Sequence, residues 1–408
     1  MNQPELLPHL FRTEFRKMAA VLVKSLGIGH ITTAEDIASE TFELALKSWP
    51  YKGIPENPVA WLYTVAKNKA KNHIQRDLLF AGKIANEMKS TFSSAEEMDI
   101  DLSEQNITDS QLQMLFALCH PVIPAEAQVA LSLRILCGFG IDEIANAFLT
   151  TREVINKRLF RAKEKLRQQK IAIVFPDQRE LALRLDTVLT TLYLLFSEGY
   201  YSESDDNVLR EEFCREAMRL MELLIRNPST DQPKVNALYA LMCFHASRFA
   251  ARRNKNNELI LYHHQDETLW DEALIRQGAY HLHLASRGEQ LSRYHLEASI
   301  AYWHTIKADS REKWESVLQL YNHLLTMSYS PIAALNRTYA LSKVAGHAVA
   351  IGEALKLNLD TNPFYFALLG ELHTGHDPVQ AKQYFQQALH LAATKADQLT
   401  IKKKMESL

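Results

Sequence analysis

Glycine, proline and cysteine are scarce in this chain of 408 residues. It has 13 glycines and 13 prolines, whereas glycine alone makes up roughly 7% of an average protein. Strong helix formers such as Ala, Leu, Glu, Lys and Gln fill most segments instead. The composition therefore predicts an all-α protein, and a chain of this length can bury the cores of two or three domains.

The few cysteines and the many histidines show no catalytic or metal-binding spacing. Four cysteines lie far apart, and we expect Cys119, Cys137, Cys214 and Cys243 to be buried free thiols. Sixteen histidines include no HExxH pattern. A glycine-rich phosphate loop, a nucleophile elbow and a paired catalytic carboxylate motif are also missing. We therefore expect no metal, no other cofactor and no enzyme activity.

Long hydrophobic runs are missing as well. No stretch of 18 or more apolar residues occurs, and the start, Met-Asn-Gln-Pro-Glu, has no basic stretch leading into an apolar core. The sequence therefore predicts a cytoplasmic protein without a membrane partner.

Positive charge is concentrated in an amphipathic helix expected over residues 151–170. This segment carries eight Lys and Arg residues against two Glu, while the whole chain has a formal net charge of −2. A local excess of positive charge predicts an anionic partner. Four apolar residues recur at helical spacing and are expected to pack inward: Ile155, Leu159, Ala162 and Leu166.

A short helix over Ile141–Phe148 and a turn at Leu149 and Thr150 precede the basic helix, and Thr150 with Glu153 predicts a capping box. This pattern is typical of a helix-turn-helix, whose second helix enters the DNA major groove. A solvated basic face is the alternative interpretation. We assign base or near-base contacts to Thr151, Arg152, Glu153, Asn156 and Lys157, and DNA backbone contacts to Arg158, Arg161 and Lys163.

Two further helices are expected upstream. The first begins at Thr33, with Asp36 in a capping arrangement, and turns Ile37, Thr41, Leu44 and Ala45 toward a core. Three prolines and a glycine predict a loop over 49–58. The second helix, 59–76, places Leu62, Val65, Ala66 and Ala70 on one side, and Lys67 and Lys71 on the other. Lysines beside Trp61 and Tyr63 suit single-stranded DNA, although Trp61 itself fits a core position better.

The chain divides into four expected segments: a helical domain at 1–77, an acidic flexible linker at 78–108, the helix-turn-helix module at 109–170, and a helical-repeat domain at 180–408. Ala354 and Ala388 are 34 residues apart, which is the tetratricopeptide period. Such repeats stack into a concave surface for a protein or peptide ligand. The turn expected at 198–202 is a candidate to dock back on the upstream modules.

These motifs, in this order, resemble those of extracytoplasmic-function sigma factors of the sigma-70 family. Residues 10–77 look like region 2, through Ala34-Glu-Asp and Glu40-Thr-Phe42, then Trp61-Leu-Tyr63, Ala66 and Asn68. Residues 109–168 look like region 4, through Val154, Lys157-Arg-Leu159 and Arg161-Ala-Lys163. The resemblance implies binding to core RNA polymerase through the β′ clamp helices and the β flap. It also implies recognition of promoter DNA at the minus-ten and minus-thirty-five elements.

Site residues follow from this resemblance. It gives the polymerase-facing or supporting surface to Asp36, Glu40 and Phe42, and minus-ten DNA to Asn57, Trp61, Lys67, Asn68, Lys71 and Arg76. The loop 49–58 would hold a flipped base. Residues beyond 180 resemble the helical-repeat extension of one sigma subgroup, through Leu192–Tyr201, Asp266–Asp271 and Ser330–Arg337.

Three classes of function are consistent with these motifs. The first is a sigma factor regulated in cis by its repeat domain. The second is an ordinary helix-turn-helix regulator with a repeat-type interaction domain, which leaves the motifs at 34–76 unexplained. The third is an enzyme or a pure scaffold, and the concentrated charge of residues 151–170 disfavours the scaffold.

Overall fold

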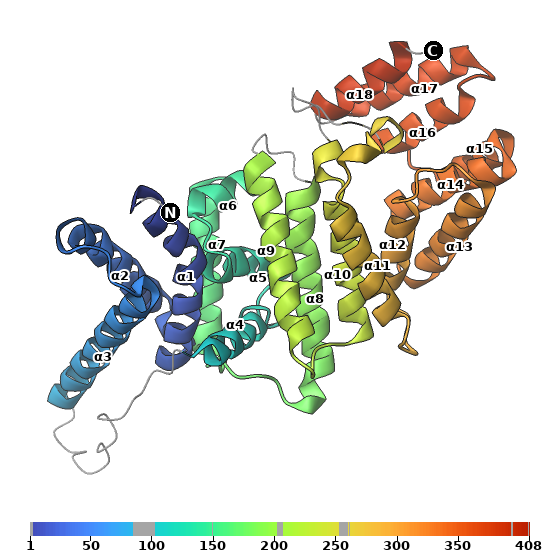
Figure 1. Ribbon diagram of the computed structural model, residues 1–408. Coiled ribbons are helices and arrows are strands. Elements are labelled where there is room, and N and C mark those ends of the chain that lie inside the picture. The colour runs from blue at the N-terminus through green and yellow to red at the C-terminus, as the bar shows by residue number, and fades with distance from the viewer. Residues whose placement is uncertain are drawn as a thin grey trace. The chain divides into compact units, whose positions relative to one another are not determined.

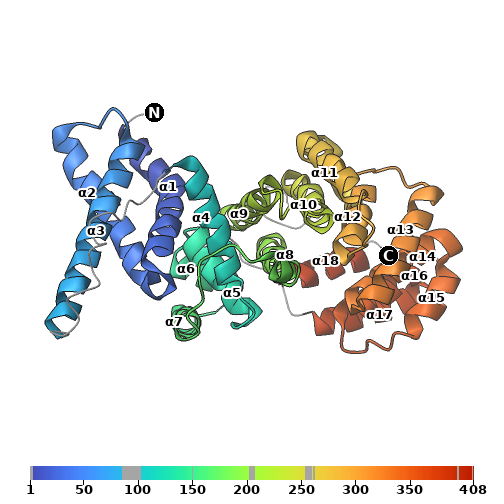
Figure 2. The same cartoon turned by 90° about the horizontal axis from the view of Figure 1, so that it is seen from below.

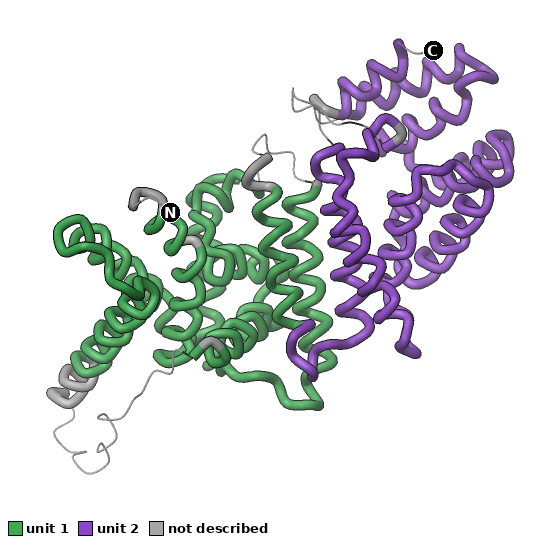
Figure 3. The backbone as a smooth tube through the Cα atoms, in the orientation of Figure 1, with its two compact units in different colours: residues 1–224 green, residues 225–408 purple. Residues whose placement is uncertain are grey.

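A computed structural model describes residues 3–84, 103–148, 150–201, 207–252, 260, 262–392, 395–406 and 408. Throughout these residues the chain forms α-helices joined by short turns, and no strand occurs among them, which confirms the all-α class. The chain separates into two compact units, Met1–Leu224 and Ile225–Leu408 (Figures 1 and 3). Each is described below by itself.

Unit 1 is a layered helical body in which α4–α7 lie between α1–α3 and the pair α8–α9 (Figures 1 and 2). Its helices are α1 (Gln3–Leu26), the 3-10 turn η1 (Ile28–His30), α2 (Ile31–Lys52), α3 (Pro58–Ile84), α4 (Glu104–Leu118), α5 (Ala125–Leu131), the π-helical turn η2 (Ser132–Leu136), α6 (Ile141–Ala147), α7 (Arg152–Gln168), α8 (Gln178–Tyr201) and α9 (Asn207–Arg226), the last of which crosses the boundary at 224.

Unit 2 continues as consecutive helices that pack in pairs, most closely α10 with α11, α13 with α14 and α16 with α17. Its elements are α10 (Pro233–Ala246), η3 (Phe249–Ala251), η4 (Tyr262–His264), η5 (Glu267–Leu269), α11 (Glu272–Ala285), α12 (Arg293–Trp303), α13 (Arg311–Met327), α14 (Pro331–Ala345), α15 (His347–Leu355), α16 (Pro363–His373), α17 (Pro378–Leu391) and α18 (Lys395–Glu406).

The expected loop at 49–58 is shorter than the prolines indicated. Helix α2 continues through Pro50 and ends at Lys52, where Gly53 adopts a positive φ of 81° and donates its backbone N–H to the Trp49 carbonyl at 3.0 Å. Pro50 is tolerated because it stands in the last turn, where few backbone hydrogen bonds follow it. Only residues 53–57 separate α2 from α3.

The start of α2 also differs from the prediction. The helix begins at Ile31, after the 3-10 turn, and its N-cap His30 makes no side-chain hydrogen bond, so the expected cap at Thr33 and Asp36 is wrong. Ile37, Thr41 and Ala45 are buried as expected. Leu44 is 41% exposed, because the core contacts one narrow stripe of α2 and Leu44 lies beside it.

Other expectations for unit 1 can be compared directly. The four cysteines are buried and free, as predicted. The linker expected at 78–108 is wrong at both ends, because residues 78–84 belong to α3 and 104–108 belong to α4, whose N-cap Ser103 accepts from the Asn106 N–H. Residues 85–102 lie outside the described residues. Residues 198–201 form the last turn of α8 rather than a loop, and Tyr200 there is buried. Ser202, like Leu149 of the turn before α7, lies outside the described residues.

Candidate nucleic-acid interface

Helix α7 presents its N-terminal turns to solvent. Thr151 caps the helix by accepting a hydrogen bond from the Val154 N–H at 3.4 Å. The cap is therefore not Thr150, whose own N–H donates to the Ala145 carbonyl of α6 at 2.9 Å. A backbone hydrogen bond, followed by the Thr151 hydroxyl, lowers the pKa of the Glu153 carboxyl. The exposed side chains of α7 include Thr151, Arg152, Glu153, Asn156, Lys157 and Arg161.

The opposite face of α7 anchors the helix. Ile155, Leu159, Ala162 and Leu166 are all at most 5% exposed, which confirms the predicted stripe. They pack toward α5 and α6. Burial of this stripe fixes the rotation of α7, so the side chains predicted to contact bases stay on the outer face.

Two of the side chains assigned to the DNA backbone are engaged inside unit 1. Arg158 contacts Glu126 of α5 at 2.9 Å, and its guanidinium lies 5.6 Å from the Phe148 ring centroid. Lys163 donates to the Glu35 carboxylate at 2.9 Å. In this conformation Arg158 and Lys163 are therefore less available for DNA than the exposed Lys157 and Arg161.

Glu35 of α2 joins the first helices of the chain to the basic helix. Its side chain is only 9% exposed, and one oxygen lies 2.9 Å from Arg134 Nε of η2 while the other lies 2.9 Å from Lys163 Nζ of α7. A buried carboxylate with two cationic partners depends on both of them, because losing either partner leaves uncompensated charge in a low-dielectric environment and destabilises the fold. The Glu35 bridge is therefore a specific contact between segments 128 residues apart.

Helix α9 also contacts both the first helices of the chain and the module formed by α4–α7. The Phe213 ring lies 4.4 Å from the Phe139 ring, and Arg219 donates to the Leu136 carbonyl at 2.9 Å. Glu216, which pairs with Arg219 at 2.7 Å, also forms an ion pair with Arg16 of α1. One turn of α9 thus contacts both α1 and the module formed by α4–α7.

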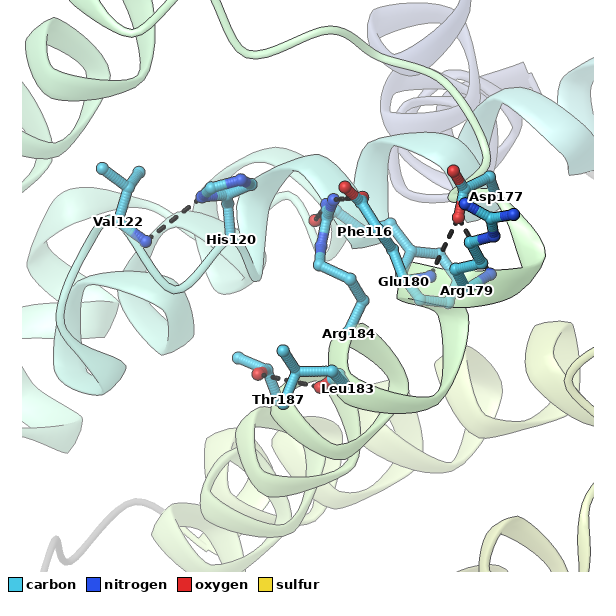
Figure 4. A network of polar contacts seen from close by, with 9 residues as sticks. All are labelled: Phe116, His120, Val122, Asp177, Arg179, Glu180, Leu183, Arg184 and Thr187. Atoms are coloured by element: carbon cyan, nitrogen blue, oxygen red, sulfur yellow. Dashed lines mark hydrogen bonds and ion pairs between the residues drawn. The ribbon is translucent and has the colours of Figure 1, made fainter.

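Helix α8 is anchored on α4 by the polar network in Figure 4. The Asp177 carboxylate caps α8 by accepting from the N–H groups of Arg179 and Glu180, both at 2.9 Å. Arg184 reaches back to the Phe116 carbonyl at 2.8 Å and lies 3.6 Å from the Glu180 carboxylate. Burial lowers the pKa of this guanidinium, with Glu180 acting in the opposite direction.

The end of α8 lies close to the Arg158 pair. Burial raises the pKa of the Glu198 carboxyl, nearby Glu126 raises it further, and Arg158 opposes both effects. Glu198 is therefore near enough to Glu126 and Arg158 to interact with them electrostatically. The segment that the sequence singled out lies at the end of α8, where Tyr200 is buried and Glu198 carries this electrostatic interaction.

The residues assigned to polymerase and to minus-ten DNA divide by exposure. Asp36 and Glu40 are exposed on α2, and Glu40 pairs with Lys69 at 2.6 Å. Phe42 is buried against the Phe11 ring at 5.1 Å, so it supports this surface rather than forming it. Among the minus-ten residues, Asn57, Asn68 and Arg76 are exposed, and Trp61, Lys67 and Lys71 are half-buried.

Two of these residues also have structural roles. Asn57 caps α3, because its side-chain oxygen accepts from the Ala60 N–H at 3.0 Å. The Trp61 ring lies 5.5 Å from the Trp49 ring at an interplanar angle of 65°, an edge-to-face contact. Trp61 therefore contributes to the packing of α2 against α3, as its preferred core interpretation predicted.

Sequence reasoning missed Glu35 and Arg134. Glu35 precedes Ala38 and Phe42 by three and seven residues, so it occupies the buried stripe of α2. A carboxylate on such a stripe needs a cationic partner, which could have identified it. The identity of that partner depends on tertiary contacts and had no local signal.

Comparison with known families matches two segments of the chain. Residues 10–77, which span most of α1, all of α2 and most of α3, match the family described as Sigma-70 region 2. The match covers this segment of the chain alone. The matched segment contains Glu35, Glu40 and the exposed surface of α2. Residues 184–286, which run from α8 into α11, match a second family, described only as a family of unknown function, DUF6596.

Two relatives extend the comparison. An uncharacterized protein of Rhizobium meliloti is 32% identical over 384 residues, which cover 91% of this chain and 90% of that protein, so the two belong to one family. The RNA polymerase sigma-H factor of Pseudomonas aeruginosa is 29% identical over 138 residues, which cover 32% of this chain and 69% of that protein. No solved structure matches. Among the described helices, none has both the length and the apolar character needed to span a membrane.

Proposed function

We propose that this chain is an extracytoplasmic-function sigma factor that binds core RNA polymerase and directs it to specific promoters. The observation that carries the proposal is the combination of a sigma-70 region 2 at 10–77 with the exposed basic turns of α7 in one compact unit. On this view α4–α7 form region 4, α6 and α7 form a helix-turn-helix, and catalysis belongs to the polymerase.

Asp36 and Glu40 supply the surface for the β′ clamp helices, and Phe42 supports it from below. Asn57, Asn68 and Arg76, with the partly exposed Lys67 and Lys71, contact the minus-ten element, where exposed polar and basic groups follow a single strand. Thr151, Arg152, Glu153, Asn156 and Lys157 read the minus-thirty-five element, and Arg161 contacts its backbone. Arg158 and Lys163 join them once their internal ion pairs open.

The contacts within unit 1 support regulation in cis. The minus-ten and minus-thirty-five elements are centred about 25 base pairs apart, which is roughly 85 Å of B-form DNA at about 3.4 Å per base pair. Glu35, however, bridges region 2 to Arg134 and Lys163 at 2.9 Å each. We propose that this closed arrangement cannot engage both elements, and that the two regions separate when core polymerase binds.

The helices after α7 supply the regulatory part. Helix α9 stabilises the closed arrangement through Phe213, Glu216 and Arg219. Helices α10–α18 form a tetratricopeptide-like domain for a protein or peptide ligand. Packing in the last hairpins favours such repeats: Gly370 of α16 lets the Phe385 ring of α17 approach closely, and Ala381, Phe385 and Ala388 are buried. Ala354 of α15, one 34-residue period earlier, is buried as well.

Run-off transcription tests the proposal. Core polymerase is mixed with the full chain and a promoter fragment from upstream of the protein's own gene, and transcripts are compared with those from core alone. We expect specific transcripts only when the chain is present. The double variant Lys157→Gln/Arg161→Gln should lose them, whereas Arg215→Gln, at an exposed site on α9, should not.

Two results would count against a sigma factor. No transcript with the wild-type chain, together with tight binding of duplex DNA in the absence of core, would indicate a helix-turn-helix regulator with a tetratricopeptide-type interaction domain. Transcription that survives the Lys157→Gln/Arg161→Gln change would remove α7 from promoter recognition.

A further inference from the structure

Unit 2 contains a group of buried cationic and aromatic side chains gathered around Tyr262 of η4. Arg248 follows the end of α10, Trp270 follows η5, and Lys313 lies in the first turn of α13. Arg248 is 9% exposed, Trp270 8% and Lys313 only 1%. Lysine and arginine are almost never buried to this extent unless they are paired. We call these three residues, Arg248, Trp270 and Lys313, together with the Tyr262 ring that they surround, the Tyr262 cluster.

Arg248 has no anionic partner in the described part of the chain. Its guanidinium lies 5.7 Å from the Tyr262 ring centroid, and its buried Nε has no hydrogen-bond acceptor among the described residues. A cation–π contact compensates only part of the cost of removing a guanidinium from water. An arginine that stays charged while buried needs an anion or several acceptors.

Lys313 adds a second positive charge beside the same ring. Its ammonium lies 5.3 Å from the Tyr262 centroid and donates to the Tyr262 hydroxyl at 3.1 Å and to the Ile306 carbonyl. Burial lowers the pKa of Lys313, Asp309 raises it, and Arg248 and Lys343 lower it again. Arg248 and Lys313 therefore repel each other across a buried site.

Neither Asp309 nor the Trp270 indole N–H offsets the excess of positive charge at this site. Asp309 already accepts from the Trp314 indole N–H and pairs with Lys343 at 3.3 Å. The Trp270 indole N–H, whose ring lies 6.2 Å from the Tyr262 ring, is buried and has no acceptor among the described residues. A third cation, Lys307, lies 5.8 Å from the Trp270 ring centroid and donates to the Gln265 carbonyl. The cluster thus has an excess of buried donors and positive charge.

We propose that the Tyr262 cluster is a binding site for a small oxyanion, a phosphate or a carboxylate group, held by the Arg248 guanidinium, the Lys313 ammonium and the Trp270 indole N–H. Guanidinium groups match the geometry of both oxyanions, and an ammonium contributes as a point charge. The near-complete burial of all three side chains restricts the ligand to a small molecule or a single anionic group. This site does not rest on the proposed sigma function and is separate from α7.

Thermal unfolding of the full chain tests the site. Sodium phosphate and sodium succinate are each titrated against sodium chloride at matched ionic strength, and the melting transition of unit 2 is followed by tryptophan fluorescence. A ligand that binds only the folded state raises the melting temperature in a saturable way. We expect this for at least one of the two probes, and the stronger probe identifies phosphate or carboxylate as the preferred group.

Three variants separate a binding site from a general salt effect. Arg248→Met and Lys313→Met should raise the half-saturating concentration of the oxyanion at least tenfold. Trp270→Phe, which removes the indole N–H but keeps an aromatic ring, should raise it to the same extent. Arg287→Met, at an exposed site in the same unit, should respond like the wild type. Without oxyanion, Arg248→Met and Lys313→Met should melt no lower than the wild type, because each removes one of two repelling buried charges.

The opposite pattern would overturn the proposal. If neither probe gives a saturable rise in the wild type, the cluster does not bind either class of oxyanion. If Arg248→Met and Trp270→Phe respond to phosphate or succinate as the wild type does, the rise comes from elsewhere. If Arg248→Met and Lys313→Met melt well below the wild type in chloride while no probe binds, the cations are structural.

Discussion

Buried charge is treated in opposite ways in the two units. In unit 1 the Glu35 carboxylate lies between Arg134 and Lys163, each 2.9 Å away, so one negative charge has two positive partners. In unit 2 Arg248 and Lys313 approach one tyrosine ring, and the nearby Asp309 is shared with Lys343 and Trp314. Unit 1 satisfies its buried charge internally, whereas unit 2 has an excess of positive charge.

This difference bears on where each unit meets its partners. A bridge such as that of Glu35 can open when a competing surface or phosphate offers the cations a new partner, so it can act as a switch. A buried positive cluster gains stability only when an anion enters it. This contrast is consistent with the proposals that unit 1 binds polymerase and promoter and that the Tyr262 cluster of unit 2 binds a small anion.

The largest effect is expected where apolar packing, rather than charge, holds unit 1 together. Phe213→Ala removes a ring that is 1% exposed and packs on Phe139, and it should lower the free energy of unfolding of unit 1 by about 3–5 kcal/mol. Leu183→Ala, at a position that is 72% exposed, is the matched control and should change it by less than about 0.5 kcal/mol. Chemical denaturation measures both, and equal effects would mean that α9 does not pack on the module α4–α7.

Opening the Glu35 bridge should cost less stability but alter function more. Glu35→Gln leaves Arg134 and Lys163 without a charged partner, so unit 1 should lose about 1–3 kcal/mol. If the proposed function is right, run-off transcription should rise at the same time, because the helices α1–α3 and α4–α7 separate more easily. Glu211→Gln, which breaks an exposed pair with Arg215 on α9, should change neither quantity. A fall in transcription with Glu35→Gln, at unchanged polymerase affinity, would contradict a restraining role for the bridge.

Binding of duplex DNA should distinguish exposed from engaged cations on α7. Each phosphate that a side chain neutralises contributes about 0.9 to the slope of log affinity against log salt. Lys157→Gln and Arg161→Gln should each reduce that slope by about 0.9, whereas Lys163→Gln should leave it nearly unchanged while Glu35 holds the lysine. In a Glu35→Gln background, Lys163→Gln should begin to reduce the slope. Equal effects of all three substitutions in the wild-type background would show that the bridge does not occupy Lys163.

The smallest effect concerns pH and unit 2. Because burial lowers the pKa of Lys313, the unfolded chain binds the lysine proton more strongly than the folded chain does between the two pKa values. Raising the pH toward the ordinary lysine range should therefore increase the contribution of Lys313 to the stability of unit 2, and lowering the pH should remove that contribution. The difference in melting temperature between wild type and Lys313→Met, measured from pH 8 to about pH 10.4, should shift in favour of the wild type. A constant difference over this interval would mean that Lys313 does not titrate abnormally.

Local patterns predicted much of unit 1, and tertiary contacts account for the rest. The buried stripe of α7, from Ile155 to Leu166, followed from helical periodicity, because one helix face must meet a core. The cap at Thr151, the passage of α2 through Pro50 and the exposure of Leu44 did not, since each depends on what packs beside the residue. The partners of Glu35, Arg134 and Lys163, lie about 100 residues or more away in sequence, and no spacing rule reaches that far.

The distance between α3 and α7, with and without core polymerase, tests the proposed account most directly. Spin labels are attached through Thr64→Cys on α3 and Gln168→Cys on α7, both exposed positions. The native thiols are buried, and burial raises the pKa of Cys119 to about 11, so the introduced cysteines react selectively. We predict one short distance for the chain alone and a longer one, by tens of ångströms, once core polymerase is added. An unchanged distance with polymerase bound would contradict the closed-to-open account.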